Sequence, residues 1–165
     1  MKNAPRPGSS ADGWGPTPGA MHVRRYGDGD WAEWLRMSRE LFPGDSIDAD
    51  EWEMRQTLAR SDAAVFVLER PNGGLAGYVE VGARPWAEGC TTSPVGYIEA
   101  WYVDPDSRQG GHGRRLLLAA EEWARARGYR EMGSDALLEN EVSYHAHLRS
   151  GYAEVERVVQ FRKTL

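Results

Sequence analysis

The segment 108–114 carries the residue types of an anion-binding turn. It reads RQGGHGR and stands between a long apolar run, which predicts a strand, and an amphipathic pattern, which predicts a helix. Glycine lets a ligand approach the backbone, and the free N–H groups at the start of a helix attract phosphate. This context favours a pyrophosphate site over a merely flexible connection. The glycines do not fit the dinucleotide-binding pattern, and the Gly-Lys-Ser/Thr ending of a P-loop is missing.

A carboxylate stands in the middle of the apolar run that precedes this turn. Glu99 lies among aromatic residues, where an ionised group is costly unless it meets a cation or a hydrogen-bond donor. An ion pair with an arginine would satisfy it, but carboxylates in such surroundings also collect at functional sites, and we favour that interpretation. Strict alternation along a strand predicts two faces, one with Tyr97, Glu99, Trp101 and Val103 and one with Ile98, Ala100 and Tyr102.

Asp135 ends the next predicted strand. Ligands in open α/β sheets bind beyond the carboxyl ends of strands, although a terminal Asp can also simply cap a helix. Asp135 gains interest because its strand is a plausible neighbour of the strand that holds Glu99.

The composition is that of one globular domain. The chain has 165 residues, of which 41% are hydrophobic and 27% charged, and the formal net charge is −5. An acidic balance argues against nucleic acid as a partner, and no apolar run approaches the ~18 residues of a membrane span. The single Cys90 excludes an internal disulfide and fits a reducing cytoplasm, and His145 and His147 are spaced too closely for one helix face, so we expect no metal site.

The first twenty residues differ from the rest. They are rich in Pro and Gly and contain no Val, Ile, Leu or Phe, so we expect residues 1–20 to form a flexible leader and residues 21–165 to form the domain. The leader lacks the apolar core of an export signal.

The elements that must position the two carboxylates follow from periodicity and capping. In the first half we expect a strand over 22–26, a helix over 31–41 capped by Asp28 or Asp30, and a helix from Asp48, with Glu51 completing a capping box, to about residue 60. A hairpin follows, with strands over 63–69 and 75–81.

The second half alternates strands with helices, which predicts a parallel strand pair. The expected order is a loop over 82–94, a strand over 95–103, a helix over 114–127, a strand over 129–135, a helix over 140–149 and a final strand over 154–163. The fold class is therefore α/β (α+β), a single domain with a mixed central sheet flanked by helices.

At this level of detail the sequence resembles a known family. Arg108-x-x-Gly111-x-Gly113 after an apolar strand, Asn140 at the start of a later helix and the pair Gly151-Tyr152 are similar to the GNAT acetyltransferases. Three further stretches, TSPVGYIE at 92–99, SDA at 134–136 and EVERVV at 154–159, resemble the aminoglycoside 6'-N-acetyltransferases of that superfamily. The resemblance covers about residues 21–163.

The resemblance implies a cytoplasmic homodimer that moves the acetyl group of acetyl-CoA to the 6'-amino group of aminoglycoside antibiotics by direct amine attack, conferring resistance. It implies catalytic roles for Asp135 and Glu99. It implies that acetyl-CoA is bound by Trp101, Tyr102, Val103, Arg108, Gln109, Gly110, Gly111, His112, Gly113, Arg114 and Asn140. It implies that the aminoglycoside is bound by Phe42, Asp45, Trp86, Glu99, Asp135 and Glu156.

The sequence departs from the family pattern at several places. Family members carry Trp and His where this chain has Phe42 and Asp45, and a Tyr where the loop here offers Trp86. Many GNAT enzymes place a Tyr general acid at the position of His147, and Tyr144 lies one turn earlier. These changes concern which aminoglycoside is preferred and which group acts as the acid.

Three questions stay open at this stage. Glu99 or Asp135 could accept the amine proton, directly or through water, or could only position the cationic sugar. The acceptor could instead be another amine, such as a polyamine or a protein amino group. A non-catalytic acyl-CoA-binding module would share the same turn at 108–114.

Overall fold

The computed structural model describes residues 20–44 and 46–165. Five strands form one sheet in the order β1-β2-β3-β4-β5. The strands are β1 (His22–Arg25), β2 (Ala63–Glu69), β3 (Leu75–Arg84), β4 (Val95–Val103) and β5 (Met132–Ser134). The helices are α1 (Trp31–Leu41), α2 (Ile47–Ala59), α3 (His112–Ala126) and α4 (Glu141–Arg149), with short 3-10 turns η1 (Asp28–Asp30) and η2 (Pro105–Ser107).

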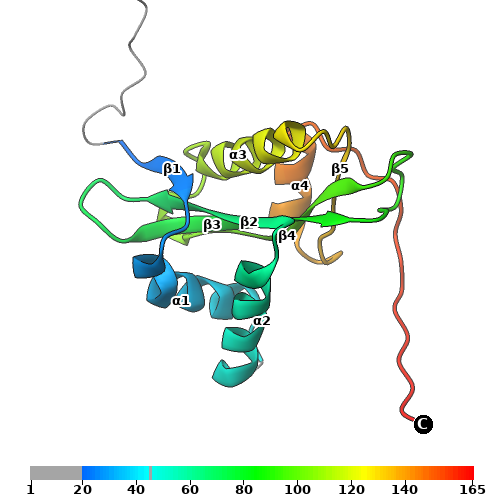
Figure 1. Cartoon of the computed structure of the whole chain (residues 1–165), viewed down its shortest axis with the longest axis horizontal. Helices are drawn as coiled ribbons and strands as arrows, with labels where there is room; N and C mark the ends of the chain where they lie inside the picture. The colour runs from blue at the N-terminus through cyan, green and yellow to red at the C-terminus, as the bar shows by residue number, and fades with distance from the viewer. Residues whose placement is uncertain (1–19, 45) are drawn as a thin grey trace, which may run out of the picture.

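The sheet separates two layers of helices (Figure 1). The apolar stripe of α3, which includes Leu116, Leu117 and Trp123, packs on one face together with Val79 and Ile98. On the other face Trp34 and Met37 of α1 and Met54 of α2 pack with side chains of β2, β3 and β4. Both cores arise because helical spacing of apolar residues meets the alternating faces of the strands.

The topology confirms the predicted mixed sheet. β1 to β4 pair antiparallel in chain order, and β4 pairs parallel with β5 through the crossover that contains α3. The predicted bounds of α1, β2 and β4 are those observed. A parallel pair needs such a long connection, which the alternation of strand and helix in the second half had indicated.

Three local predictions were wrong. β3 continues to Arg84, so residues 82–84 of the predicted loop are strand, because they still pair with β4. The cap of α2 is Ser46, whose hydroxyl accepts from the Ala49 N–H at 3.2 Å, rather than Asp48. At α1, Asp30 stands at the cap position but makes no capping bond, because its carboxylate binds Arg24 instead.

The prediction of two regular faces on β4 was also wrong. Glu80 and Val81 are adjacent on β3, yet they pair with Ala100 and Ile98, so Glu99 is the extra residue of a β-bulge. The alternation therefore shifts at this point. Ile98, Trp101 and Val103 all pack on the α3 side, whereas Ala100 and Tyr102 pack on the α1 side.

The predicted final strand over 154–163 is absent. Residues 152–165 form neither helix nor strand in the described part of the chain, and the segment runs away from the body (Figure 1). The sequence has strand character, but none of the described strands pairs with it to complete the backbone hydrogen bonds. Apolar side chains are consequently left in solvent, and Phe161 is 93% exposed.

Two further predictions concern the leader and the absence of a membrane span. Residues 1–19 of the predicted leader and Asp45 lie outside the described residues. Among the residues that the structure describes, no helix combines the length and the apolar character needed to cross a bilayer.

Candidate active site

The candidate site lies where β4 and β5 part. Ile98 pairs with Ser134, which is the last residue of β5, while β4 continues to Val103. Glu99 comes directly after Ile98, and Asp135 comes directly after Ser134. The two carboxylates therefore lie at neighbouring positions where the strands separate, as predicted from the sequence. In the described chain, no strand pairs with residues 99–103 on the β5 side, so this stretch of β4 offers free backbone groups to a ligand.

Glu99 makes the ion pair with an arginine that the sequence left open as the alternative to a functional role, and its partner is Arg84, which the sequence did not single out. Arg84 donates from Nε to Glu99 Oε1 at 3.1 Å and from Nη2 to Oε2. The guanidinium carbon also lies 3.4 Å from the ring centroid of Tyr97. Hydrogen bonding to Glu99 raises the pKa of Arg84, so the guanidinium carries its positive charge. Arg84 was missed because its strand was expected to end at residue 81.

Asp135 is exposed and contributes negative charge beside the same group of side chains. Burial raises the pKa of the Tyr97 hydroxyl to about 12, and the charge of Asp135 contributes to that shift. Tyr97 is accordingly neutral at physiological pH. The site therefore combines one solvated carboxylate, Asp135, with one paired carboxylate, Glu99.

A third carboxylate, Glu80, lies beneath this pair on the α1 side of the sheet. Its Oε1 accepts from the Trp34 indole N–H at 3.1 Å, and its Oε2 accepts from the Thr57 hydroxyl at 3.4 Å. Burial raises the pKa of Glu80 to about 7, and the charge of Glu99 adds to the effect. An acidic residue inside an apolar strand was the available signal, the same one that identified Glu99.

The turn at 108–114 has the backbone geometry of an anion site. Gly111 is the N-cap of α3 with φ of +75°, and no side chain caps the first turn of the helix. The N–H groups of that turn are therefore free to bind an anion. Gly113 packs so closely on Trp101 that a Cβ would lie 2.8 Å from the indole Cζ2. Arg108 closes the turn by donating from Nε to the Val103 carbonyl at 2.9 Å.

His147 reaches the same end of the sheet from α4. Its Nδ1 lies 2.8 Å from the Ser143 carbonyl and therefore carries a proton, which leaves Nε2 to accept from the Ser134 hydroxyl at 2.9 Å. The imidazole meets Trp101 edge to face, with ring centroids 5.1 Å apart. Tyr144 instead points to Glu154, to which its hydroxyl donates at 2.9 Å. Of the two general-acid candidates, His147 is the one beside β4 and β5.

The remaining predicted residues surround the carboxylates less closely. Asn140 caps α4, since its Oδ1 accepts from the Ser143 N–H at 3.0 Å. Phe42 and Trp86 are 49% and 65% exposed, and Glu156 lies in the exposed C-terminal segment. That segment passes the loop of Trp86, because a Cβ on Gly89 would lie 2.5 Å from Val155. The structure thus brings Glu99 and Asp135 to neighbouring positions, whereas Phe42, Trp86 and Glu156 are exposed to solvent.

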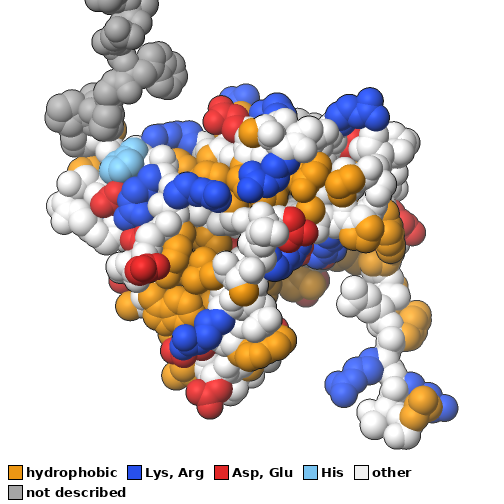
Figure 2. Space-filling view, viewed as in Figure 1, with side chains coloured by type: hydrophobic (Ala, Val, Ile, Leu, Met, Phe, Trp, Pro, Cys, Tyr) orange, Lys and Arg blue, Asp and Glu red, His pale blue; other side chains and the backbone are white. Residues whose placement is uncertain are grey.

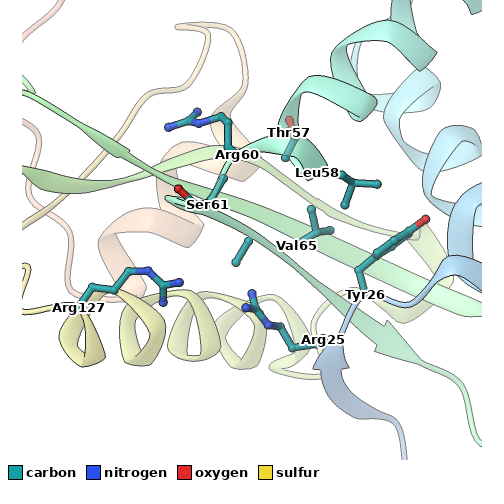
Figure 3. A pocket seen from close by; sticks show the side chains of 10 residues that line it. Arg25, Tyr26, Thr57, Leu58, Arg60, Ser61, Val65 and Arg127 are labelled. Atoms are coloured by element: carbon teal, nitrogen blue, oxygen red, sulfur yellow. The ribbon is translucent and has the colours of Figure 1, made fainter.

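Two surface hollows lie away from these residues. One, of about 360 Å³, is lined by ends of β1, α2 and β2 and by Arg127, and three arginines face it (Figure 3). Another, of about 490 Å³, is lined by residues 91–94 and 127–130. Basic side chains are correspondingly frequent in the middle of the face drawn in Figure 2. Neither hollow is lined by a predicted site residue.

Comparison with known proteins agrees with the geometry. The model of the acetyltransferase (GNAT) family matches residues 31–152. The aminoglycoside N(6')-acetyltransferase type 1 of Klebsiella aerogenes is 40% identical over 146 residues, which is 87% of this chain and 96% of that protein. The corresponding enzyme of Stenotrophomonas maltophilia is 38% identical, over 88% of this chain and 95% of its own length.

Solved structures give the same result. The structure of AAC(6')-Iy in complex with the bisubstrate analog CoA-S-monomethyl-acetylneamine is 31% identical in sequence and superposes with a TM-score of 0.82, covering 88% of this chain and 99% of that one. The family model matches most of the chain, and the chain covers nearly the full length of these relatives. It therefore belongs to the acetyltransferase (GNAT) family, as an enzyme of its aminoglycoside 6'-N-acetyltransferase group.

Proposed function

We propose that this enzyme acetylates the 6'-amino group of aminoglycosides at the parting of β4 and β5. The observation that carries the proposal is the pairing of Ile98 with Ser134, which brings Glu99 and Asp135 to neighbouring positions. The product is an amide that no longer carries the positive charge of the amine. Loss of that charge is the chemical basis for the resistance that we expect the enzyme to confer.

Acetyl-CoA supplies the activated acetyl thioester. We place its pantetheine arm along Trp101, Tyr102 and Val103, on the edge of β4 that no described strand pairs with. We place its pyrophosphate on the turn formed by Arg108, Gln109, Gly110, Gly111, His112, Gly113 and Arg114, with Asn140 as a further contact. The support is the uncapped start of α3 and the left-handed Gly111, which together present N–H groups to an anion.

Asp135 is the group that we expect to accept the proton of the acceptor amine. An aliphatic amine is protonated at neutral pH and has to lose a proton before its nitrogen attacks the thioester carbon. Asp135 is exposed and lies beside the Tyr97 hydroxyl, whereas Glu99 is engaged by Arg84. We therefore assign proton acceptance, directly or through water, to Asp135, and assign to Glu99 the electrostatic positioning of the substrate cation.

The leaving group needs a proton donor, whereas the amine needs a proton acceptor. When the C–N bond has formed, the C–S bond breaks and the CoA thiolate departs, and a proton on that sulfur makes departure easier. We assign this proton to the Nε2 of a protonated His147, which passes it through the Ser134 hydroxyl that lies 2.9 Å away, while the proton taken from the amine leaves to solvent. A backbone N–H near Val103 would stabilise the oxyanion of the intermediate.

The outer walls of the acceptor site set the preferred drug. We assign Phe42, Asp45, Trp86 and Glu156 to this role. The two aromatic side chains offer exposed faces on which a sugar ring can rest. The two acidic residues would attract further ammonium groups of the aminoglycoside, and the chain's net charge of −5 would favour binding of such a polycation.

We also propose that the enzyme works as a cytoplasmic homodimer formed by residues 21–165. The C-terminal segment 152–165 has strand character, exposed apolar side chains and no pairing partner among the described strands. A second copy could supply that partner. Light scattering tests the proposal: the full chain should have twice the mass of its Phe161→Asp variant, and equal masses would contradict it.

The test of the activity is a thiol-release assay with acetyl-CoA. Kanamycin and tobramycin should be acetylated, and mass spectrometry should place the acetyl group on the 6' nitrogen. A polyamine and a peptide amine serve as competing acceptors. Turnover of those amines alone would favour a different GNAT substrate, and acetyl-CoA binding without any turnover would favour a non-catalytic module.

A further inference from the structure

Arg84 lies in the acceptor site and has no part in the reaction proposed above. It reaches Glu99 with two nitrogens at once, which is the strongest geometry available to an arginine and a carboxylate. Its flat guanidinium also covers the ring of Tyr97 at 3.4 Å. Two independent contacts therefore fix this positive charge in place.

The location of that charge is unexpected for a site that receives a polycation. The side chain of Arg84 is 43% exposed and that of Glu99 is 26% exposed, so solvent and substrate can reach both. The negative charge of Asp135 also acts on Arg84. Glu99 and Asp135 would otherwise present two negative charges to an acceptor, and Arg84 cancels one of them.

We infer that Arg84 is a specificity-determining residue that masks Glu99 and thereby limits how strongly the site binds an additional ammonium group of the acceptor. The inference rests on the proposed acceptor site at Glu99 and Asp135. An acceptor that needs Glu99 must displace the guanidinium from a stacked, two-point contact. An acceptor that needs only Asp135 binds without this displacement.

If Arg84 masks Glu99, removing both charges together should weaken aminoglycoside binding less than removing the charge of Glu99 alone. Glu99→Gln removes the masked carboxylate and leaves the Arg84 cation unpaired beside the incoming ammonium, so the KM for an aminoglycoside should rise. Arg84→Gln in the same chain removes that cation and restores the original local charge. The double variant should therefore bind the aminoglycoside better than Glu99→Gln alone.

The experiment compares Arg84→Gln, Arg84→Lys, Glu99→Gln and the double variant in the full chain, with kanamycin A and with tobramycin, which has an additional amino group. At low salt Arg84→Gln should lower the KM for tobramycin about fivefold, and that for kanamycin A less, as expected for one partly exposed charge. Salt should reduce the difference. Arg84→Lys keeps the charge and should stay within about twofold of the wild-type KM.

The controls separate masking from a structural role. Arg125→Gln removes an arginine whose ion pair with Glu121 lies along α3, and it should leave the KM for both drugs unchanged. The KM for acetyl-CoA and the thermal midpoint report on folding. If Arg84→Gln destabilises the chain, the salt dependence of Arg84→Lys and of Glu99→Gln still tests the charge.

Two results would overturn the inference. One is a higher aminoglycoside KM for Arg84→Gln than for the wild type with an unchanged thermal midpoint. The other is a double variant no better than Glu99→Gln. Failure of the proposed acceptor site is distinguishable, because Asp135→Asn would then retain wild-type turnover, whereas failure of the masking inference alone leaves Asp135→Asn inactive.

Discussion

The proposed cofactor side and the proposed acceptor side of the site are built differently. The cofactor side consists of β4, the turn at 108–114 and α3, which are consecutive in the chain and packed on one core. The acceptor side draws on the ends of α1, β3 and β5 and on the C-terminal segment, and many of its side chains are exposed. In the proposed site, acetyl-CoA is therefore bound by one local unit, and the aminoglycoside by separate segments with exposed side chains.

The largest effect is expected at Asp135, which lies where the two sides meet. Asp135→Asn keeps the shape but cannot accept the amine proton, so kcat/KM should fall about a hundredfold or more, the usual contribution of a general base. Steady-state kinetics with tobramycin measure it. Glu139→Gln, an exposed carboxylate four residues later, is the matched control and should keep wild-type rates. Equal rates for both variants would remove Asp135 from the mechanism.

Glu80 supports the acceptor side from below, and its effect should appear in stability. Its pKa in the folded protein is about 7 against 4.5 for the ordinary carboxyl, so the folded state binds the proton more tightly than the unfolded chain. Stability should then fall as pH rises from about 4.5 to about 7 and stay level above that range. Glu80→Gln removes this cost.

The measurement is urea unfolding of wild type and Glu80→Gln at pH 5 and pH 8. The difference in free energy of unfolding should shift in favour of the variant by up to about 2 kcal/mol between these conditions, since one pKa unit corresponds to about 1.4 kcal/mol. A difference that is independent of pH would mean that Glu80 is ionised with an ordinary pKa in the folded enzyme.

On the cofactor side, two glycines at opposite ends of α3 form a matched pair. Gly111 has φ of +75° and Gly128 has φ of +81°, and a Cβ at either position would meet no atom within 4 Å. Substitution by Ala should lower the free energy of unfolding by about 1 kcal/mol at both, because only the backbone conformation is strained. Gly111→Ala alone should also raise the KM for acetyl-CoA, by about tenfold, since it disturbs the N–H groups of the turn. An equal acetyl-CoA KM for the two variants would count against the turn as the pyrophosphate site.

The same contrast explains how much the sequence could predict. The turn, α3 and β4 were predictable because glycine spacing, apolar periodicity and strand propensity are local signals. The neighbouring positions of Glu99 and Asp135 followed from the alternation of strands and helices. These are the features of the cofactor side and of its border.

What escaped prediction depends on register and on distant partners. The bulge at Glu99 arises because β3 and β4 pair out of step, which no single strand encodes. Arg84 belongs to the site only because β3 is longer than its apolar run. The segment 154–163 has the sequence of a strand, but no strand among residues 20–44 and 46–165 pairs with it, and this decides its conformation.

The smallest effect is expected at the outer wall of the acceptor side, where two tryptophans allow a controlled test. Trp86 is 65% exposed in the loop after β3, and Trp52 is 61% exposed on α2. Neither substitution by Ala should cost much stability, because little area is buried at either position. If Trp86 supports a sugar ring, Trp86→Ala should raise the aminoglycoside KM about fivefold while the acetyl-CoA KM stays constant, a size typical of one aromatic contact. Trp52→Ala should change neither constant. If the two variants change the aminoglycoside KM equally, Trp86 does not contact the drug. Drug preference would then be set by Phe42 and the C-terminal segment.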